Sequence, residues 1–532
     1  MRKKHRKYFV NLIFPAVLFG SLTGVFTAII VLLYKIASGK VIHFSEHGYE
    51  FLKENLVYSP IIIPFLFLLA LFFSFIYKKN PNLSGGGIPT SIGILRGLVP
   101  FKWISNLFGV FFLSLVSFLI GVPLGTEGPS VQMGTAAGMG CIRTLSKKNR
   151  AWERYSMTGG ACAGFSVATG APISGILFSI EEAHQRISPM IIIVSTTSVM
   201  FSYITVEILA PILNVGTSLL PKFSLNALSV WDLYIPIIIG IIMGLFAVLF
   251  LKYYKIINVL FNKKLKKIPH SVKIFSIFFI TFILGLFSYD FISTGHELML
   301  FLFEKKISIL LLLLLLIVRS TLTLGANTNR ITGGVFIPIL AIGSVLSSIL
   351  AQTMETLFGL EGDYHVIILL LGITACISGM MKMPLTAIAF AVEALNLSNN
   401  ILYVIVVSVT AFIITEIFEA KSINDSVLEN KIETQNHGKA AKVIDTYVTV
   451  QSGSFAIGKQ IRDIFWPANL FVLSIKHTED INAEIDEHGG KAIRNGDILH
   501  VRYSTFDEKL TKDQLIAIVG EQEYAENETD LI

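Results

Sequence analysis

One glycine- and proline-rich stretch, residues 121–134, constrains the fold of this chain more than any other. It reads GVPLGTEGPSVQMG and lies between two apolar runs. Pro129 suits the first turn of a helix, because the N–H that proline lacks would have no partner there. The stretch therefore predicts a helix that begins at Glu127 or just after it.

Glu127 stands where a helix attracts negative charge. Backbone N–H groups at a helix start have no partner, and the helix dipole adds partial positive charge. The surrounding glycines let an anion approach the backbone closely. A carboxylate can occupy the same place and leave it on taking a proton, so one residue would couple an anion site to the proton concentration. A helix cap in a tightly packed membrane core explains the segment equally well.

The composition predicts a membrane protein. Of 532 residues, 53% are hydrophobic and 15% are charged, whereas a soluble domain carries about 25% charged residues. A full span needs about 20 apolar residues, and several apolar segments are shorter. Short segments broken by glycine and proline are typical of interrupted helices around a buried site. The apolar segments lie near 8–36, 60–78, 105–122, 190–212, 233–259, 272–289, 307–324, 334–352, 364–378, 383–395 and 401–418.

Charge and cysteine usage narrow the setting. The first seven residues include five Lys or Arg, which by the positive-inside rule places this end in the cytoplasm. This end and the basic loops explain much of the net charge of +6, so no nucleic-acid partner is predicted. Cys141, Cys162 and Cys376 form no C-x-x-C pair, so we expect buried thiols, with no disulfide and no metal site. The segment 40–57 is more polar and is expected to be in water.

Three consecutive glycines, Gly85 to Gly87, precede Ile88 and Pro89. Such a run cannot sit comfortably inside a helix. It predicts a bare-backbone turn leading into a helix over 90–96, and the exposed N–H groups of such a turn can hold an anion. A plain loop between helices is the simpler alternative.

An apolar segment, residues 171–182, ends in two acidic residues, Glu181 and Glu182. Carboxylates at the end of a helix oppose its dipole, so two in a row need a reason. They lie in the headgroup layer beside an Arg or water, or they take up protons on the second face of the membrane.

The second half of the chain repeats the first. Residues 383–394 align with 171–182, and residues 338–343 align with 129–134. Weak internal symmetry with a broken segment in each half predicts a site at the repeat interface.

The repeat sorts the acidic residues. Glu181 has an acidic counterpart in Glu393, so we expect it to be structural. Glu127 and Glu182 align with Phe336 and Ala394, which makes them the better functional candidates.

The counterpart of the organising stretch in the second half is 333–338. Its backbone N–H groups at Val335 and Phe336 are expected to face an anion from the other side. Arg319 and Arg330 flank it, and each either attracts anions or sits at an interface.

Three ordered motifs, GGGIP at 85–89, GTEGP at 125–129 and GGVFIP at 333–338, resemble those of the chloride channel and transporter (CLC) family. The resemblance covers roughly residues 8–434. It implies a homodimer with one anion pathway per subunit, built from inverted repeats of tilted and broken helices. With the small C-terminal domain described below, the expected fold class is an all-α multi-spanning membrane protein plus a cytosolic α/β domain.

The resemblance also implies roles for single residues. Glu127 is similar to the external gating glutamate, and Glu182 to the internal proton-transfer glutamate of the exchanger branch. Having both implies an anion/proton antiporter, with chloride the expected anion, in the plasma membrane of a bacterium and in contact with its lipid. The anion-binding candidates are Gly85, Gly86, Gly87, Ile88, Thr126, Gly128, Val335, Phe336 and Asn424.

Three positions depart from the family pattern. Gly86 replaces the usual serine, Asn424 falls where the central tyrosine is expected, and Thr126 replaces an arginine. An Asn amide can donate to an anion, but chloride selectivity is left open. The fluoride branch also departs at the serine and tyrosine positions, so a fluoride/proton exchanger is an alternative.

The composition changes near residue 435. Strand-like runs at 446–450, 470–475 and 498–503 alternate with turns at 489–490 and 495–497, which predicts a small α/β domain. The pattern at 457–464, 466–467 and 496–499 resembles the TrkA-C (RCK-C) lobe of potassium-transport regulators. The resemblance implies a domain that dimerises and binds a small regulator such as a cyclic dinucleotide; a dimerisation module that binds no ligand is an equal alternative. The expected division is a transport domain (1–434), a linker (435–442), the α/β domain (443–522) and an acidic tail (523–532).

Other functions remain as alternatives. A passive anion channel would move anions without protons, and a membrane sensor would bind its ligand in the C-terminal domain and move no ion. No potassium-channel filter sequence is present. No nucleophile, metal or nucleotide motif indicates an enzyme, and no resident cofactor is expected. Both termini are expected to be cytoplasmic.

Overall fold

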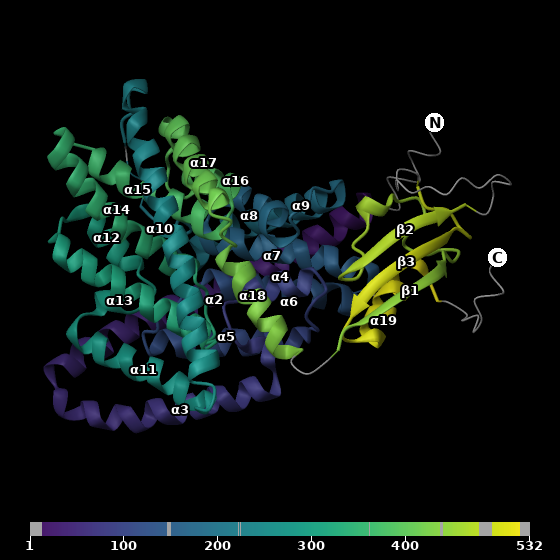
Figure 1. Ribbon diagram of the computed structural model, residues 1–532, viewed down its shortest axis with the longest axis horizontal. Coiled ribbons are helices and arrows are strands. Elements are labelled where there is room, and N and C mark those ends of the chain that lie inside the picture. Colours follow the sequence, from purple (N-terminus) through teal and green to yellow (C-terminus); the bar gives the residue numbers. More distant parts are fainter. Residues whose placement is uncertain are drawn as a thin grey trace.

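The computed structural model describes residues 13–145, 150–221, 223, 225–360, 362–436, 440–477 and 492–521. It has a large helical body and a small sheet domain beside it (Figure 1). In the described part of the chain, nine helical segments are long and apolar enough to cross a membrane. The expected multi-spanning, mostly helical fold is confirmed.

The helices of the body fall into two runs. The first comprises α2 (Phe14–Glu54), α3 (Ser59–Lys79), α4 (Ile88–Leu95), α5 (Trp103–Leu119), α6 (Glu127–Leu145), α7 (Glu153–Thr169), α8 (Pro172–Phe178) and α9 (Pro189–Leu213). The second comprises α10 (Tyr234–Val259), α11 (His270–Phe287), α12 (His296–Glu304), α13 (Ile309–Thr328), α14 (Phe336–Phe358), α15 (Tyr364–Met381), α16 (Pro384–Glu393), α17 (Ile401–Ile417) and α18 (Ile423–Gln435).

The two runs start their helices at the positions that the sequence repeat aligns. Helix α6 begins at Glu127 and α14 at Phe336, while α8 begins at Pro172 and α16 at Pro384. The prolines lie in the first turn, where the missing N–H is not needed. The repeat in the sequence is therefore a repeat of helices with matched starts.

Helix α2 is longer than the apolar run at 8–36. It continues through Glu54, into the more polar segment 40–57 that is expected to be in water. Tyr49 is buried near its far end, and its hydroxyl donates to the Ile120 carbonyl at 2.6 Å. The polar side chains of His47 and Glu50 are exposed on the same helix. The contact of Tyr49 with Ile120 thus holds the part of the helix that lies beyond the apolar run.

The sheet domain contains β1 (Lys442–Thr449), β2 (Leu470–Lys476), β3 (Ile498–Thr505) and α19 (Glu508–Val519). The sheet is antiparallel with strand order β1-β3-β2. Each strand overlaps its predicted run and extends past it at one end, by four residues for β1, one for β2 and two for β3. Gly496 has the positive φ of a turn glycine. The predicted turn at 489–490 and the acidic tail lie outside the described residues.

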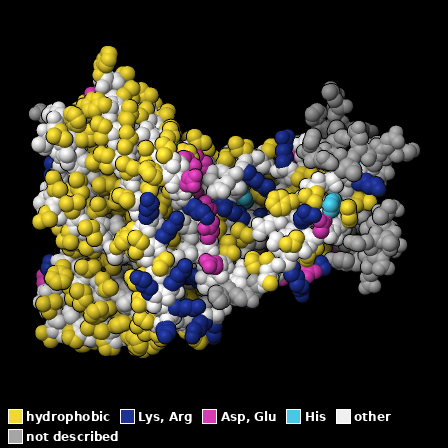
Figure 2. Space-filling model, viewed as in Figure 1, with side chains coloured by type: hydrophobic (Ala, Val, Ile, Leu, Met, Phe, Trp, Pro, Cys, Tyr) yellow, Lys and Arg dark blue, Asp and Glu magenta, His cyan; other side chains and the backbone are white. Residues whose placement is uncertain are grey.

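Side-chain types are distributed unevenly over the surface. Figure 2 shows hydrophobic side chains covering the helical body, while Lys and Arg gather on the part of the body next to the sheet domain.

The three cysteines are buried and free of disulfides, as expected.

Helices α6 and α7 pack in backbone contact. A Cβ added to Gly134 would lie 2.0 Å from the Gly160 carbonyl oxygen, and one on Gly160 would lie 2.0 Å from that of Gly134. We therefore expect Gly160→Ala to lower the free energy of unfolding by about 1–3 kcal/mol, as overpacking does. Gly39→Ala in α2, where nothing lies within 4 Å, should be neutral or stabilising. Thermal unfolding in detergent measures both, and equal melting temperatures would contradict the contact.

Candidate functional site

Three glycine-rich turns meet at the starts of α4, α6 and α14. Gly125 and Gly334 exchange two backbone hydrogen bonds, of 2.6 and 2.7 Å. A Cβ on Gly87 would lie 2.1 Å from the Gly128 carbonyl oxygen, and one on Gly128 would lie 2.3 Å from that of Gly86. Only glycine allows this approach, and three helix N-termini converge as a result. We call this place the glycine junction.

Glu127 is the first residue of α6 and lies in the glycine junction. Its side chain is fully buried, and its Oε1 accepts a hydrogen bond from the Thr126 hydroxyl at 3.1 Å. Its Oε2 has no hydrogen-bond partner in the described part of the chain. The backbone amide of Ile337, in the first turn of α14, lies close to the carboxyl group. The predicted position at a helix start is confirmed, and the carboxyl group does not face lipid.

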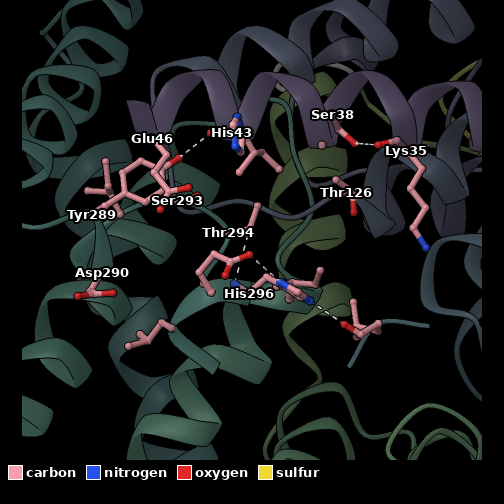
Figure 3. Close-up of a pocket in the computed structure, with 18 of the residues that line it drawn as sticks. Lys35, Ser38, His43, Glu46, Thr126, Tyr289, Asp290, Ser293, Thr294 and His296 are labelled. Carbon is pink, nitrogen blue, oxygen red and sulfur yellow. Dashed lines mark hydrogen bonds and ion pairs between the residues drawn. The ribbon is translucent and has the colours of Figure 1, made fainter. Parts of the chain in front are cut away.

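A cavity of about 380 Å³ reaches Thr126 and Ile337 on one side of the glycine junction. We call it the outer cavity. Figure 3 shows Lys35 extending from α2 beside Thr126 in this cavity. The Lys35 ammonium interacts electrostatically with the Glu127 carboxylate. Sequence reasoning missed Lys35, which supplies positive charge where Thr126 replaces an arginine.

Arg319 also lines the outer cavity, but its guanidinium is engaged by the backbone. It donates to the carbonyls of Asp290 and Ile292, each at 2.7 Å, and to that of Ser293 at 3.0 Å. Of the two roles left open by the sequence, the structure supports an interface role for Arg319.

Glu182 lies in a π-helical turn, Ser179–Ala183, and its side chain is buried. Its Oε1 accepts a hydrogen bond from the Asn424 amide at 2.9 Å. Arg96 donates to the carbonyl oxygens of Glu182 and Ala183, at 2.8 and 3.0 Å. A buried carboxylate is thereby held against the start of α18, a contact that the sequence did not predict.

The neighbouring acidic residue, Glu181, has a different role. Its carboxylate accepts from the backbone N–H groups of Leu385 and Thr386 at 2.8 and 2.7 Å, at the start of α16. Glu393 does the same for α8, accepting from the N–H groups of Ile173 and Ser174 at 2.7 and 3.0 Å. Each of the two aligned acids therefore caps the start of the helix that leads to the other acid. This arrangement supports the structural role predicted for Glu181.

Apart from Asn424, which contacts Glu182, the anion-binding candidates belong to the three glycine-rich turns and the helix starts that follow them. Phe336 is fully buried, with its ring 5.2 Å from that of Phe165 and 5.5 Å from that of Phe390. The Ile88 N–H donates to the Gly86 carbonyl at 2.7 Å, so this amide already has an acceptor. The assignment as anion ligands stays a prediction for Gly85, Gly86, Gly87, Ile88, Thr126, Gly128, Val335, Phe336 and Asn424.

A sequence profile described as voltage gated chloride channel matches residues 66–416. The chain belongs to the voltage-gated chloride channel (CLC) family. The predicted family resemblance is thereby confirmed for the helical body, while the TrkA-C likeness of the sheet domain stays a prediction.

Similar proteins cover most of this CLC chain. The H(+)/Cl(−) exchange transporter ClcA of Salmonella schwarzengrund (strain CVM19633) is 27% identical over 448 residues, which cover 81% of this chain and 91% of the relative. The structure of a slow cyanobacterial Cl−/H+ antiporter has a TM-score of 0.70 at 24% identity, covering 79% of this chain and 99% of that chain. A CLC-type fluoride/proton antiporter has a TM-score of 0.59 at 18% identity, with coverages of 76% and 96%.

The reciprocal caps predict a matched pair of stability effects. Glu181→Ala and Glu393→Ala should each lower the free energy of unfolding by about 0.5–2 kcal/mol, the usual cost of losing a helix cap. Glu54→Ala, which removes an exposed carboxylate at the end of α2, serves as the control. Thermal unfolding in detergent compares the three variants, and an unchanged melting temperature for both cap variants would disprove the capping role.

Proposed function

We propose that this CLC chain is a proton-coupled anion antiporter with chloride as its anion. The observation that carries the proposal is the pair of buried carboxylates, Glu127 and Glu182, neither of which has an acidic counterpart in the repeat. Glu127 lies in a junction of helix N-termini, where an anion would also be stabilised. The naming of the Salmonella relative as an exchange transporter supports the same activity.

The two carboxylates lie toward different sides of the body. Helix α6 carries Glu127 at its start and spans 19 residues, or about 28 Å at 1.5 Å per residue. At its other end Arg143 pairs with Glu153 of α7 at 3.1 Å. The next residue, Arg154, donates to the Phe465 carbonyl of the sheet domain at 3.1 Å. Glu182 lies on this sheet-domain side, because the nearby Arg186 donates to the Ile464 carbonyl at 3.3 Å.

Exchange follows from competition for the glycine junction. The ionised Glu127 side chain takes the place that a chloride ion would take among the backbone N–H groups. Protonation from the outer cavity removes the negative charge of Glu127 and weakens its attraction to the N–H groups, so an anion replaces it. Glu182 receives or delivers the proton on the sheet-domain side, and the Asn424 amide holds its ionised form in place.

Orientation, assembly and location extend the proposal. The accumulation of Lys and Arg beside the sheet domain (Figure 2) supports a cytoplasmic location for that side. Both termini are then cytoplasmic in a bacterial plasma membrane, and the working unit is a homodimer with one pathway per subunit.

A fluoride/proton exchanger is a second candidate. Gly86 offers no hydroxyl to an anion, and the Asn424 amide is bonded to Glu182. At the first of these positions the hydroxyl expected from the family is absent, and at the second the side chain already has a hydrogen-bond partner. Chloride selectivity would depend on both positions. Chloride and fluoride fluxes measured side by side distinguish the two exchangers.

The sheet domain supplies a regulatory contact through Phe465. This buried ring stacks on His184 with centroids 4.4 Å apart, and the guanidinium groups of Arg154 and Arg186 lie 5.2 and 4.7 Å from its centroid. Because His184 directly follows the turn that carries Glu182, docking of Phe465 fixes the turn. A small regulator of the domain, such as a cyclic dinucleotide, or dimerisation of the domain would act through this contact.

Paired anion and proton fluxes in proteoliposomes test the exchange. A chloride gradient should drive proton movement in the wild type. Glu182→Gln and Glu127→Gln should each lower the proton-to-chloride ratio at least about tenfold, because neither amide can carry a proton. Glu181→Gln, which alters the adjacent acid, should keep the ratio. Wild-type anion flux without proton movement would identify a passive channel, and no ion flux at all would favour a sensor.

Releasing Phe465 tests the regulatory contact. Phe465→Ala should speed amide hydrogen exchange over residues 179–186 and slow ion exchange several-fold, since the turn bearing Glu182 loses its anchor. Phe471→Ala removes an equally large ring that is exposed on the same domain and should change neither quantity. Identical hydrogen exchange in the two variants would contradict the coupling.

A further inference from the structure

Lysines gather where α3 ends and where α10 turns into α11. The segments 55–126 and 233–289, which contain these places, carry eleven Lys or Arg and no Asp or Glu. Six of the lysines lie exposed at these helix ends, and we call them the lysine patch: Lys78, Lys79, Lys263, Lys264, Lys266 and Lys267. Figure 2 shows Lys and Arg grouped at the lower edge of the body, where Figure 1 places α3 and α11.

Packing between α3 and α11 brings the two parts of the lysine patch together. The ring centroids of Tyr77 in α3 and His270 in α11 are 6.2 Å apart, and Lys78 interacts electrostatically with His270. Just after α3, the Asn82 side chain accepts a hydrogen bond from Gln435 at 3.3 Å. Gln435 is the last residue of α18, from which the linker leads to the sheet domain. The patch is therefore one surface on the sheet-domain side of the body.

The lysine patch combines unpaired charge with exposed apolar side chains. None of its six lysines takes part in an ion pair in the described residues, and the lysines that do so lie elsewhere. The Lys79 ammonium lies 4.4 Å from the ring centroid of Phe75, which is 56% exposed on α3. Leu260 and Ile268 are exposed on either side of the four lysines of the α10–α11 turn. Cations beside apolar side chains at the end of a membrane span suit a lipid, which has a charged headgroup and apolar chains.

The helix ends that carry the lysine patch also contact the chain that leads into the glycine junction. The Tyr77 hydroxyl accepts from the Thr332 N–H at 2.9 Å and is hydrogen-bonded to the Thr332 hydroxyl at 2.7 Å. His270, the first residue of α11, has its Nε2 at 3.1 Å from the Asn329 carbonyl oxygen. The two glycines before α14 follow Thr332 directly. The positions of these two helix ends therefore bear on the glycine turn that precedes α14.

We propose that the lysine patch binds anionic phospholipid headgroups of the leaflet on the sheet-domain side, and that the bound lipid holds the ends of α3 and α11 against residues 329–332. Clusters of about four to eight Lys or Arg next to a membrane span bind anionic lipid headgroups. The unpaired charges are complementary to phosphate groups, and the neighbouring apolar side chains are complementary to acyl chains, which a soluble anion lacks. Lipid binding is independent of the ion that the chain moves, whereas an effect of lipid on transport rests on the proposed function.

Native mass spectrometry of the full-length protein tests the binding. In micelles that contain equal amounts of phosphatidylglycerol and phosphatidylcholine, the wild type should retain phosphatidylglycerol preferentially. The patch variant replaces the four lysines of the α10–α11 turn: Lys263→Gln, Lys264→Gln, Lys266→Gln and Lys267→Gln. The control variant removes the same charge from the sheet domain: Lys442→Gln, Lys476→Gln, Lys509→Gln and Lys512→Gln.

The two variants should differ in lipid affinity. The patch variant should bind phosphatidylglycerol at least about tenfold more weakly than the wild type, because each lysine near the headgroups adds attraction, while the control variant should keep the wild-type affinity. Equal affinities of the two variants would overturn the site. Glycerol phosphate, which carries the anionic group without acyl chains, should not displace the lipid at equal concentration. Equal competition by it would overturn the lipid assignment in favour of a soluble anion.

Flux measurements in liposomes test the effect of the lipid on transport. Wild-type anion flux should fall several-fold when phosphatidylcholine replaces phosphatidylglycerol, because the ends of α3 and α11 lose their lipid contacts. The patch variant should be slow in both lipids, and the control variant should follow the wild type. Equal wild-type rates in the two lipids would refute the effect on transport. The absence of ion flux in every liposome would reject the proposed function instead, and the binding measurement would still decide the lipid site.

Discussion

Direct backbone contact at the glycine junction is the constraint on which the pathway depends. Three helices can aim their free N–H groups at one place only if the turns before them touch without side chains. The paired hydrogen bonds between Gly125 and Gly334 and the close approach of Gly87 to Gly128 provide that contact. In the proposed exchange, a carboxylate and an anion compete for the same N–H groups, and the proton concentration decides between them.

The repeat separates structural from functional acids. Glu181 and Glu393 occupy matched positions. Glu181 caps the start of α16 and Glu393 caps the start of α8, so the two acids stabilise the packing of the two repeats. Glu127 and Glu182 break the symmetry, and each lies buried where a charge has few partners. The symmetric residues hold the two halves together, whereas the asymmetric ones are the residues proposed to couple anion and proton movement.

Cations from distant parts of the chain surround this pathway. Arg319 is close in sequence to the second glycine turn, yet backbone carbonyls engage it. Lys35 comes from α2 and lines the outer cavity, and Lys431 comes from α18 and lines a smaller cavity beside Gly85 and Gly86. The sheet domain approaches the same region through Phe465, next to the turn that bears Glu182. These side chains reach the region through tertiary packing, and the proposed regulation by the sheet domain would act through the Phe465 contact.

The sequence by itself determined the membrane class, the internal repeat, the helix start at Glu127, the structural role of Glu181 and the three strands. Each follows from local rules of hydropathy, proline and glycine geometry, or strand patterning. Only the tertiary structure decided the full length of α2, the Asn424 contact to Glu182, and the positions of Lys35 and Lys431. Those depend on contacts between residues that are mostly far apart in the chain, for which no local pattern exists.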